Sequence, residues 1–214
     1  MIFPKWTNFL PLVLVVVLGL GLTTVIFVFS YWFTDKHLVV GYQPLQPIAF
    51  SHKIHNVDLG IDCRYCHFSV ERSSVSSIPP SATCMNCHNQ VRTDRPEIKK
   101  LKAYHESGNP IPWVRVHRLP EYVSFDHSVH VKKGVSCAEC HGRVDQMAEV
   151  RHDQDLSMAW CLDCHRNPDS KLRPQSQITN MSWTLSPQER ATLGAQLRKE
   201  NFVHPRTDCS ACHR

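Results

Sequence analysis

One short motif that could hold a metal cofactor occurs five times in this 214-residue sequence. Each copy has two cysteines separated by two residues and followed at once by a histidine. In this arrangement the two thiols form thioethers with a haem, and the adjacent imidazole becomes the proximal ligand of its iron. The motif therefore predicts five covalently bound haem c groups, attached by Cys63, Cys66 and His67; Cys84, Cys87 and His88; Cys137, Cys140 and His141; Cys161, Cys164 and His165; and Cys209, Cys212 and His213.

Two other uses of paired cysteines are a zinc ribbon and a set of disulfides. Neither requires a histidine directly after the second cysteine in every copy. All ten cysteines belong to the five motifs, so none is left for a separate disulfide. Because c-type haem is attached outside the cytoplasmic membrane, we expect this part of the chain to lie there.

A second pattern, Phe-x-His-x-x-His, precedes two of the anchors, at residues 50–55 and 125–130. Another anchor follows each of them, which predicts two dihaem modules (residues 50–112 and 113–170) and a terminal segment (171–214) for the fifth haem. Histidines at positions i and i+3 share one helical face but lie a turn apart, so they can reach two neighbouring irons. The predicted distal ligands of four irons are His52, His55, His127 and His130.

The fifth iron needs a distal ligand from elsewhere in the chain. We choose His117, which stands in an apolar and aromatic stretch just before the second module. Met147 and His204 are weaker choices, and a methionine ligand would raise the potential of that haem. The remaining donors are His105, His152, Met158 and Met181.

An apolar segment precedes all of these motifs. Residues 10–33 carry no charge and would form a helix of about 36 Å, long enough to cross a bilayer. This run exceeds the apolar region of a cleavable signal peptide and lacks its cleavage site, so we expect an uncleaved anchor within residues 1–36. The haem chemistry places the amino terminus in the cytoplasm and the haem domain (50–214) in the periplasm, after a proline-containing neck (37–49).

The fold class follows from the ratio of chain to cofactor. Roughly 36 residues per haem are too few to bury five macrocycles in an ordinary side-chain core. We expect a mainly α-helical protein with much irregular loop and a core dominated by haem. Helices are predicted from Pro96 to His105 and, by a capping-box pattern, from Pro187 to about Glu200. We interpret the net charge of +5 as partial compensation for the carboxylates of the haems, and not as a sign that the chain binds nucleic acid.

Four blocks of the sequence (50–55, 60–67, 113–120 and 160–166) resemble the pentahaem cytochrome subunit of alternative complex III, the ActA family. The Phe-x-His-x-x-His element alone is shared with class III cytochromes, in which the first histidine ligates the nearest haem and the second a different one. The resemblance implies a single-pass membrane protein in a respiratory or photosynthetic chain.

The same resemblance implies the partners. A complex that oxidises quinol, by expectation menaquinol, would contain a large iron–sulfur subunit, polytopic quinol-binding subunits and a monohaem cytochrome c. The pentahaem subunit would pass electrons to a soluble cytochrome c, a copper protein or a terminal oxidase. The chain itself would be a non-catalytic electron-transfer subunit of this oxidoreductase.

Two enzymatic functions are alternatives to electron relay for a multihaem sequence of this kind. A self-contained quinol dehydrogenase of the small anchored type typically has a methionine two residues after a haem-binding histidine, and Ser69, Gln90, Arg143 and Asn167 stand there instead. A multihaem reductase with an open iron usually carries a Cys-x-x-Cys-Lys motif, which this sequence lacks. Both patterns favour electron relay.

Overall fold

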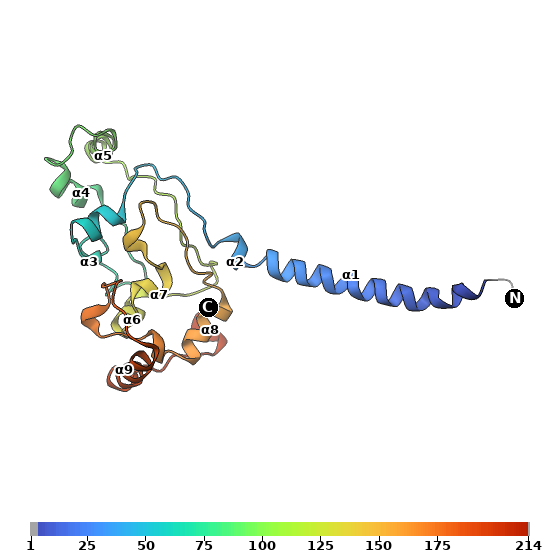
Figure 1. Cartoon of the computed structure of the whole chain (residues 1–214). Helices are drawn as coiled ribbons and strands as arrows, with labels where there is room; N and C mark the ends of the chain where they lie inside the picture. Colours follow the sequence, from blue (N-terminus) through green and yellow to red (C-terminus); the bar gives the residue numbers. More distant parts are fainter. Residues whose placement is uncertain (1–3, 214) are drawn as a thin grey trace. The chain divides into compact units, whose positions relative to one another are not determined.

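The computed structural model describes residues 4–213 and divides the chain into two compact units, residues 1–40 and 41–214. In the first unit a short 3₁₀ turn, Lys5–Phe9, leads into α1, Leu10–Trp32, which is followed by α2, Asp35–Leu38 (Figure 1). By length and composition α1 could cross a membrane, as the sequence predicted. The hydroxyls of Thr23 and Ser30 donate to the carbonyls of Gly19 and Ile26, so these polar groups are satisfied within the helix.

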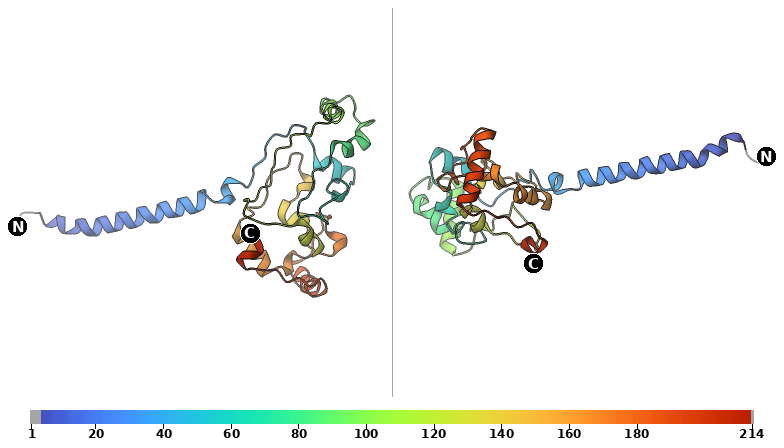
Figure 2. Two further views of the ribbon diagram at one scale, coloured as in Figure 1. Left: turned by 180° about the vertical axis from the view of Figure 1, so that it is seen from behind. Right: turned by 90° about the horizontal axis from the view of Figure 1, so that it is seen from below.

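The second unit is built from short helices and long connections, and Figure 2 shows it from two further sides. Isolated bridges join Val123 to His213 and Val135 to Leu172, and no strand occurs within residues 4–213. The expectation of a mainly helical fold with much loop is confirmed. The helices are a π-helix, η2 (Lys53–Asp58), and α3 (Cys63–Cys66), α4 (Ser81–His88), α5 (Pro96–Ser107), α6 (His127–Lys132), α7 (Cys137–His141), α8 (Met158–Arg166), α9 (Pro187–Glu200) and α10 (Cys209–Cys212), with three 3₁₀ turns, Val144–Gln146, η4 (Asp169–Lys171) and Gln175–Gln177.

Side chains alone form only small apolar clusters in this unit. One consists of Ile48, Met85 and Leu101, beneath α4 and α5. The other consists of Leu172, Leu197 and Val203, beneath α9. Clusters of this size bury little apolar surface for a domain of this length, in keeping with a fold whose interior is completed by a cofactor.

Two predicted helices are present: α9 has its expected ends, and α5 begins at the expected residue but ends two residues later, at Ser107. α5 has Pro96 in its first turn, and Gly108 caps its carboxyl end with a φ of +70°, which suits glycine. α9 begins with the predicted capping box, in which the Ser186 hydroxyl accepts from the Glu189 backbone N–H at 3.3 Å and the Glu189 carboxylate accepts from the Ser186 N–H at 3.0 Å. The close approach of α9 to η4 is possible because Gly194 has no side chain.

The segment from Gly41 to Ile48 packs along the rest of the second unit. Gly41 N donates to the carbonyl of His152 at 2.7 Å, and His152 N donates to the carbonyl of Tyr42 at 2.9 Å. The side chain of Gln46 pairs with both backbone groups of Val114, each at 2.9 Å. These contacts hold this part of the predicted neck against the segments that carry His117 and His152.

Candidate haem-iron sites

Each cysteine motif lies on one turn of helix. We number the sites 1 to 5 by their first cysteines, Cys63, Cys84, Cys137, Cys161 and Cys209. The residues before the anchors cap two of these turns: Asp62 accepts from the N–H of Arg64 at 2.8 Å, and Ser136 from the N–H of Ala138 at 3.3 Å. A helical turn brings the two thiols and the following histidine of each site to one side of the backbone.

The ten thiols are free in this structure. Burial raises the pKa of the Cys63 thiol to about 11 and that of Cys140 to about 12. These thiols are therefore protonated at neutral pH in this structure. No group of three or more histidines, cysteines and carboxylates within residues 4–213 is clustered as the ligands of a single metal ion would be.

Four pairs of histidine rings have the spacing of two ligands on one iron. A histidine nitrogen binds a metal ion at about 2.0–2.1 Å and lies about 1.2 Å from its ring centre, so two imidazoles on opposite sides of one iron have centres about 6.4 Å apart. The observed separations are 6.5 Å for His52 and His67, 6.2 Å for His55 and His88, 6.4 Å for His127 and His141, and 6.2 Å for His130 and His165.

The two modules repeat this geometry. In the first pair of each module the rings are nearly parallel, with interplanar angles of 5° for His52 and His67 and 8° for His127 and His141. In the second pair the rings are rotated by 64° and 43°. In one predicted module His52 is the N-cap of η2 and His55 lies within it, whereas in the other His127 and His130 both lie in α6, so a π-helix and an α-helix present the same i, i+3 arrangement.

The phenylalanine of each Phe-x-His-x-x-His motif packs against both histidines of that motif, a role that the sequence pattern alone does not reveal. Phe50 stacks on His55 with centres 4.4 Å apart and meets His52 edge-on at 4.9 Å. Phe125 makes the same two contacts with His130, at 4.6 Å, and with His127, at 4.8 Å. The first residue of the motif thus fixes both imidazoles by packing.

In six of the eight paired histidines the ring nitrogen Nδ1 contacts a backbone carbonyl oxygen. A carbonyl only accepts, so each such Nδ1 carries a proton and each Nε2 keeps a lone pair for a metal. Burial lowers the pKa of His52 to about 4, which keeps that imidazole neutral. The six Nδ1 to oxygen contacts are His55 to Ser51 (2.8 Å), His67 to Ser77 (2.9 Å), His88 to Val91 (3.1 Å), His127 to Ser74 (2.8 Å), His130 to Asp126 (2.7 Å) and His165 to Arg206 (2.7 Å).

Site 5 differs from the other four. The ring beside His213 is that of Tyr122, with centres 5.7 Å apart. The structure places His117, the ligand chosen for this site from the sequence, against His141 and His152. His152 is almost fully buried, its Nδ1 donates to the carbonyl of Val116 at 3.3 Å, and its buried Nε2 has no hydrogen-bond partner.

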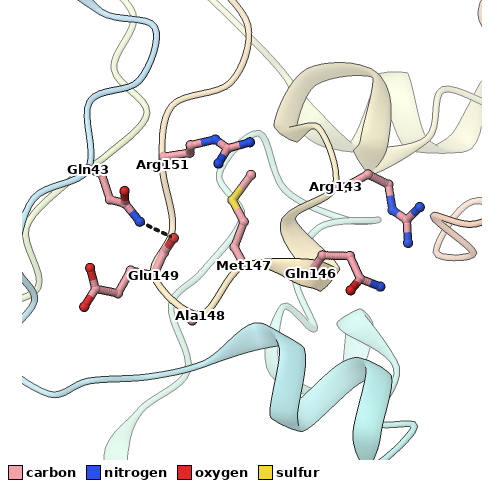
Figure 3. Close-up of a pocket in the computed structure, with 7 residues that line it drawn as sticks. All are labelled: Gln43, Arg143, Gln146, Met147, Ala148, Glu149 and Arg151. Carbon is pink, nitrogen blue, oxygen red and sulfur yellow. Dashed lines mark hydrogen bonds between the residues drawn. The ribbon is translucent and has the colours of Figure 1, made fainter.

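The weaker candidates are dispersed. Met147 is buried and lines a cavity of about 350 Å³ between Gln43 and Arg151, where Gln43 donates to the carbonyl of Glu149 at 2.9 Å (Figure 3). Met181 is also buried, whereas Met158 and His204 are exposed. His105 is exposed, and its Nδ1 lies 3.2 Å from the Ser81 hydroxyl.

Known proteins resemble both halves of this arrangement. The Class III cytochrome C family matches residues 34–119, and cytochrome c7 and related cytochrome c matches residues 123–214. The multihaem cytochrome c subunit of a menaquinone reductase from Nitratidesulfovibrio vulgaris is 36% identical over 160 residues, which are 73% of this chain and 72% of the relative. The chain belongs to the class III and c7-type multihaem cytochromes c.

A second relative of this cytochrome is similar over a shorter stretch. Cytochrome c-552 of Desulfotalea psychrophila is 30% identical over 78 residues, which are 29% of this chain and only 15% of that relative. The family binds covalent c-type haem and transfers electrons. The anchors, the neutral thiols and the imidazole pairs described above fit that cofactor.

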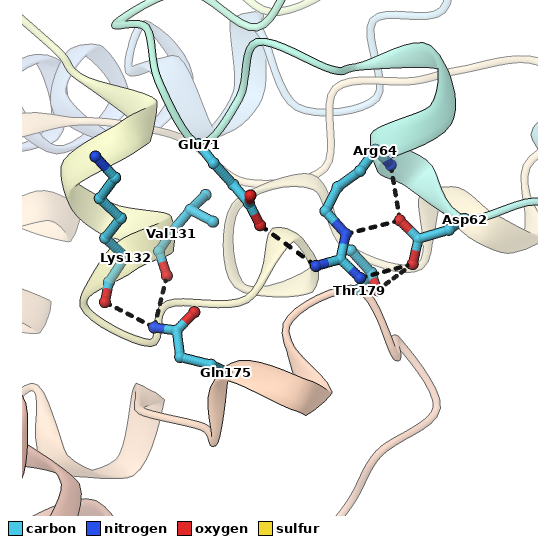
Figure 4. A network of polar contacts seen from close by, with 7 residues as sticks. All are labelled: Asp62, Arg64, Glu71, Val131, Lys132, Gln175 and Thr179. Atoms are coloured by element: carbon cyan, nitrogen blue, oxygen red, sulfur yellow. Dashed lines mark hydrogen bonds and ion pairs between the residues drawn. The ribbon is translucent and has the colours of Figure 1, made fainter.

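A network of charges ties site 1 of this multihaem cytochrome to its carboxyl-terminal part. Arg64 is held by Asp62 at 2.9 Å and by Glu71 at 3.3 Å, and the hydroxyl of Thr179 donates to Asp62 at 2.8 Å (Figure 4). The hydrogen bonds of Arg64 lower the pKa of Asp62 to about 2. Figure 4 also shows Gln175 donating to the carbonyls of Val131 and Lys132 at the end of α6.

Proposed function

We propose that this cytochrome is a five-haem relay subunit of a membrane complex that exchanges electrons with the quinone pool, in the manner of alternative complex III. The observation that carries the proposal is the set of four imidazole pairs at 6.2–6.5 Å. A haem bound at each site would supply a one-electron iron centre. At these four sites two protein ligands would leave the iron no open position for a substrate, which favours relay over catalysis.

The proposed ligands follow from these pairs. Proximal ligands are the five motif histidines, and distal ligands are His52 for site 1, His55 for site 2, His127 for site 3 and His130 for site 4. Nδ1 to carbonyl contacts at six of the eight rings in the four pairs support the assignment, because they leave Nε2 free. All ten cysteines form the thioethers, giving five haem c groups in the complete protein.

Contacts between the sites support one order along the protein. η2 joins sites 2 and 1, since His55 faces His88 and His52 faces His67. The loop 69–77 joins sites 1 and 3 through its carbonyls, which accept from the Nδ1–H of His67 and from that of His127.

The remaining contacts complete the row. α6 joins sites 3 and 4, because it carries both His127 and His130. The Arg206 carbonyl joins site 4 to site 5, since it accepts from His165 only three residues before Cys209. We infer the order 2, 1, 3, 4, 5. In Figure 1 α4, which carries the site 2 anchor, lies in the upper part of the second unit and α8, which carries the site 4 anchor, in the lower part.

The partners and the location belong to the same proposal. We propose that α1 anchors the chain in the cytoplasmic membrane with the amino terminus inside and the haem domain in the periplasm. The complex would include an iron–sulfur subunit, polytopic quinol-binding subunits and a monohaem cytochrome c. The electron acceptor would be a soluble cytochrome c, a copper protein or a terminal oxidase.

The relative from Nitratidesulfovibrio vulgaris favours a second candidate with the opposite direction of electron flow. That protein is a cytochrome subunit of a menaquinone reductase. A subunit of this kind would deliver electrons to the quinone pool instead of receiving them from it. The same row of sites serves either direction, so the partner complex decides which one operates.

The decisive experiment is purification of the native complex from detergent-solubilised membranes. We expect iron–sulfur and polytopic subunits to co-purify with this chain, and its mass to include five haems. Stopped-flow mixing with a menaquinol analogue would reduce the haems of the first candidate's complex, whereas a reduced periplasmic cytochrome would reduce those of the second. A purified single chain that turns over quinol unaided would contradict both and show a self-contained dehydrogenase.

A further inference from the structure

The hydrogen bond of His141 distinguishes site 3 from its neighbours. In six of the eight paired imidazoles Nδ1 donates to a backbone carbonyl. The Nδ1 of His141 lies instead 3.3 Å from Nε2 of His117, a second imidazole. The proposed ligation of the iron by Nε2 of His141 leaves the ring proton on Nδ1, so the nitrogen of His117 is the acceptor.

The position of His117 does not suit it as a ligand in its own right. Its ring centre lies 4.4 Å from that of His141, at an angle of 84°, and 5.0 Å from that of His152. Both separations are well below the 6.2–6.5 Å of the four ligand pairs. In addition, the Nε2 lone pair that would bind a metal already accepts the proton of His141.

The surroundings hold His117 in this position. The Nδ1 of His152 donates to the carbonyl of Val116, the residue before His117, at 3.3 Å. Arg115 Nε donates to the carbonyl of His117 itself at 3.0 Å. The backbone on both sides of the ring is therefore fixed, and the ring faces the back of His141 as part of the fold.

We propose that His117 is a positioning residue for His141, setting the orientation of that imidazole and its strength as an electron donor to the iron. Hydrogen bonding to the outer nitrogen of a ligating histidine raises its basicity, and an imidazole nitrogen is a stronger base than a carbonyl oxygen. A more strongly donating ligand stabilises the oxidised iron and lowers the potential of site 3. This inference rests on the proposed ligation of site 3 by His127 and His141.

The test uses the full-length protein in detergent, carrying His117→Phe or His117→Gln. We expect no new high-spin signal by electron paramagnetic resonance, while one midpoint potential rises. For His117→Phe we expect about a tenfold change in one reduction equilibrium, which is about 59 mV for one electron. His117→Gln keeps a weaker acceptor and should give a smaller rise in the same potential. The matched control is His105→Gln, because His105 is exposed and contacts only Ser81 among the hydrogen bonds described.

Two results would overturn the proposal. A new high-spin signal in either His117 variant would show that His117 is itself an iron ligand, as the sequence suggested. Unchanged potentials in His117→Phe would show that its hydrogen bond has no effect on site 3. A separate variant tests the proposed ligation of site 3 itself. If His127 is not a ligand of that iron, His127→Ala will leave the haem of site 3 low-spin.

Discussion

The imidazole rings of His55 and His88 lie with their centres 6.2 Å apart, although His55 stands just before the anchor of site 1 and His88 closes the anchor of site 2. His52, one helical turn earlier, faces His67 of site 1. η2 therefore joins two sites, and Phe50 packs against both of its imidazoles. The same arrangement recurs at α6.

Replacement of these two histidines should affect different sites. We expect His55→Ala to remove a ligand from site 2 and His52→Ala to remove one from site 1, with one new high-spin haem in each case. Electron paramagnetic resonance with potentiometric titration would count the altered haems, and combining each variant with Cys84→Ser and Cys87→Ser would identify the site. The assignment is wrong if the high-spin signal of His55→Ala survives removal of the site 2 anchor.

Asp62 should make the stability of the protein depend on acidity. Its pKa is lowered to about 2, so it contributes stability at pH values above its ordinary pKa of about 3.9, and this contribution is lost as pH falls through about 2. Asp62→Asn keeps an oxygen for the cap but removes the charge, whereas Asp62→Ala should also lose about 0.5–2 kcal/mol of capping.

Denaturant unfolding of the wild type and Asp62→Asn at several pH values checks this prediction. The difference between their free energies of unfolding should shrink as the pH falls from 5 to 2 (roughly the range set by the two pKa values). A difference that stays constant across the range would show that the carboxylate of Asp62 does not contribute through its charge.

Gly194 should resist enlargement. A β-carbon at this position would clash with the carbonyl oxygen of Asp169 in η4. This oxygen belongs to the backbone, so it cannot move away by rotation of a side chain. Alanine would favour the helix by about 1 kcal/mol, but overpacking costs about 1–3 kcal/mol and requires α9 to shift. We expect Gly194→Ala to lower the melting temperature.

A matched variant separates packing from helix propensity in this case. Ala191 lies on the same helix and is exposed, so Ala191→Gly should lose only the propensity term. Thermal unfolding followed by circular dichroism measures both. A stabilised Gly194→Ala protein would mean that α9 and η4 are not in close contact.

The first helix should account for membrane attachment of the single chain. When a cleavable signal peptide replaces residues 1–36 in cells that lack the partner subunits, we expect the haem protein in the soluble periplasmic fraction. The full chain should remain in carbonate-washed membranes, because burial of α1 in lipid does not depend on ionic contacts. Retention of the shortened chain in those membranes would reveal another attachment.

The local chemistry of the chain was predictable from its sequence. A Cys-x-x-Cys-His run places thiols and an imidazole on one turn of helix whatever the surrounding fold, because all three groups belong to one short segment. The apolar stretch of α1 and the capping box of Ser186 and Glu189 are local in the same sense. These signals sufficed for the mainly helical, haem-binding character of the protein.

Only the tertiary structure decided which imidazoles face one another. His130 lies opposite His165, and His117 contacts His141, although the two residues of each pair belong to different segments of the chain. The local sequence around one histidine does not indicate which other histidine it will face. The sequence suggested His117 as a distal ligand, whereas the fold places its Nε2 at 3.3 Å from Nδ1 of His141. Ring pairing depends on how loops pack and which nitrogens they leave free, and such contacts exist only once the whole chain has folded.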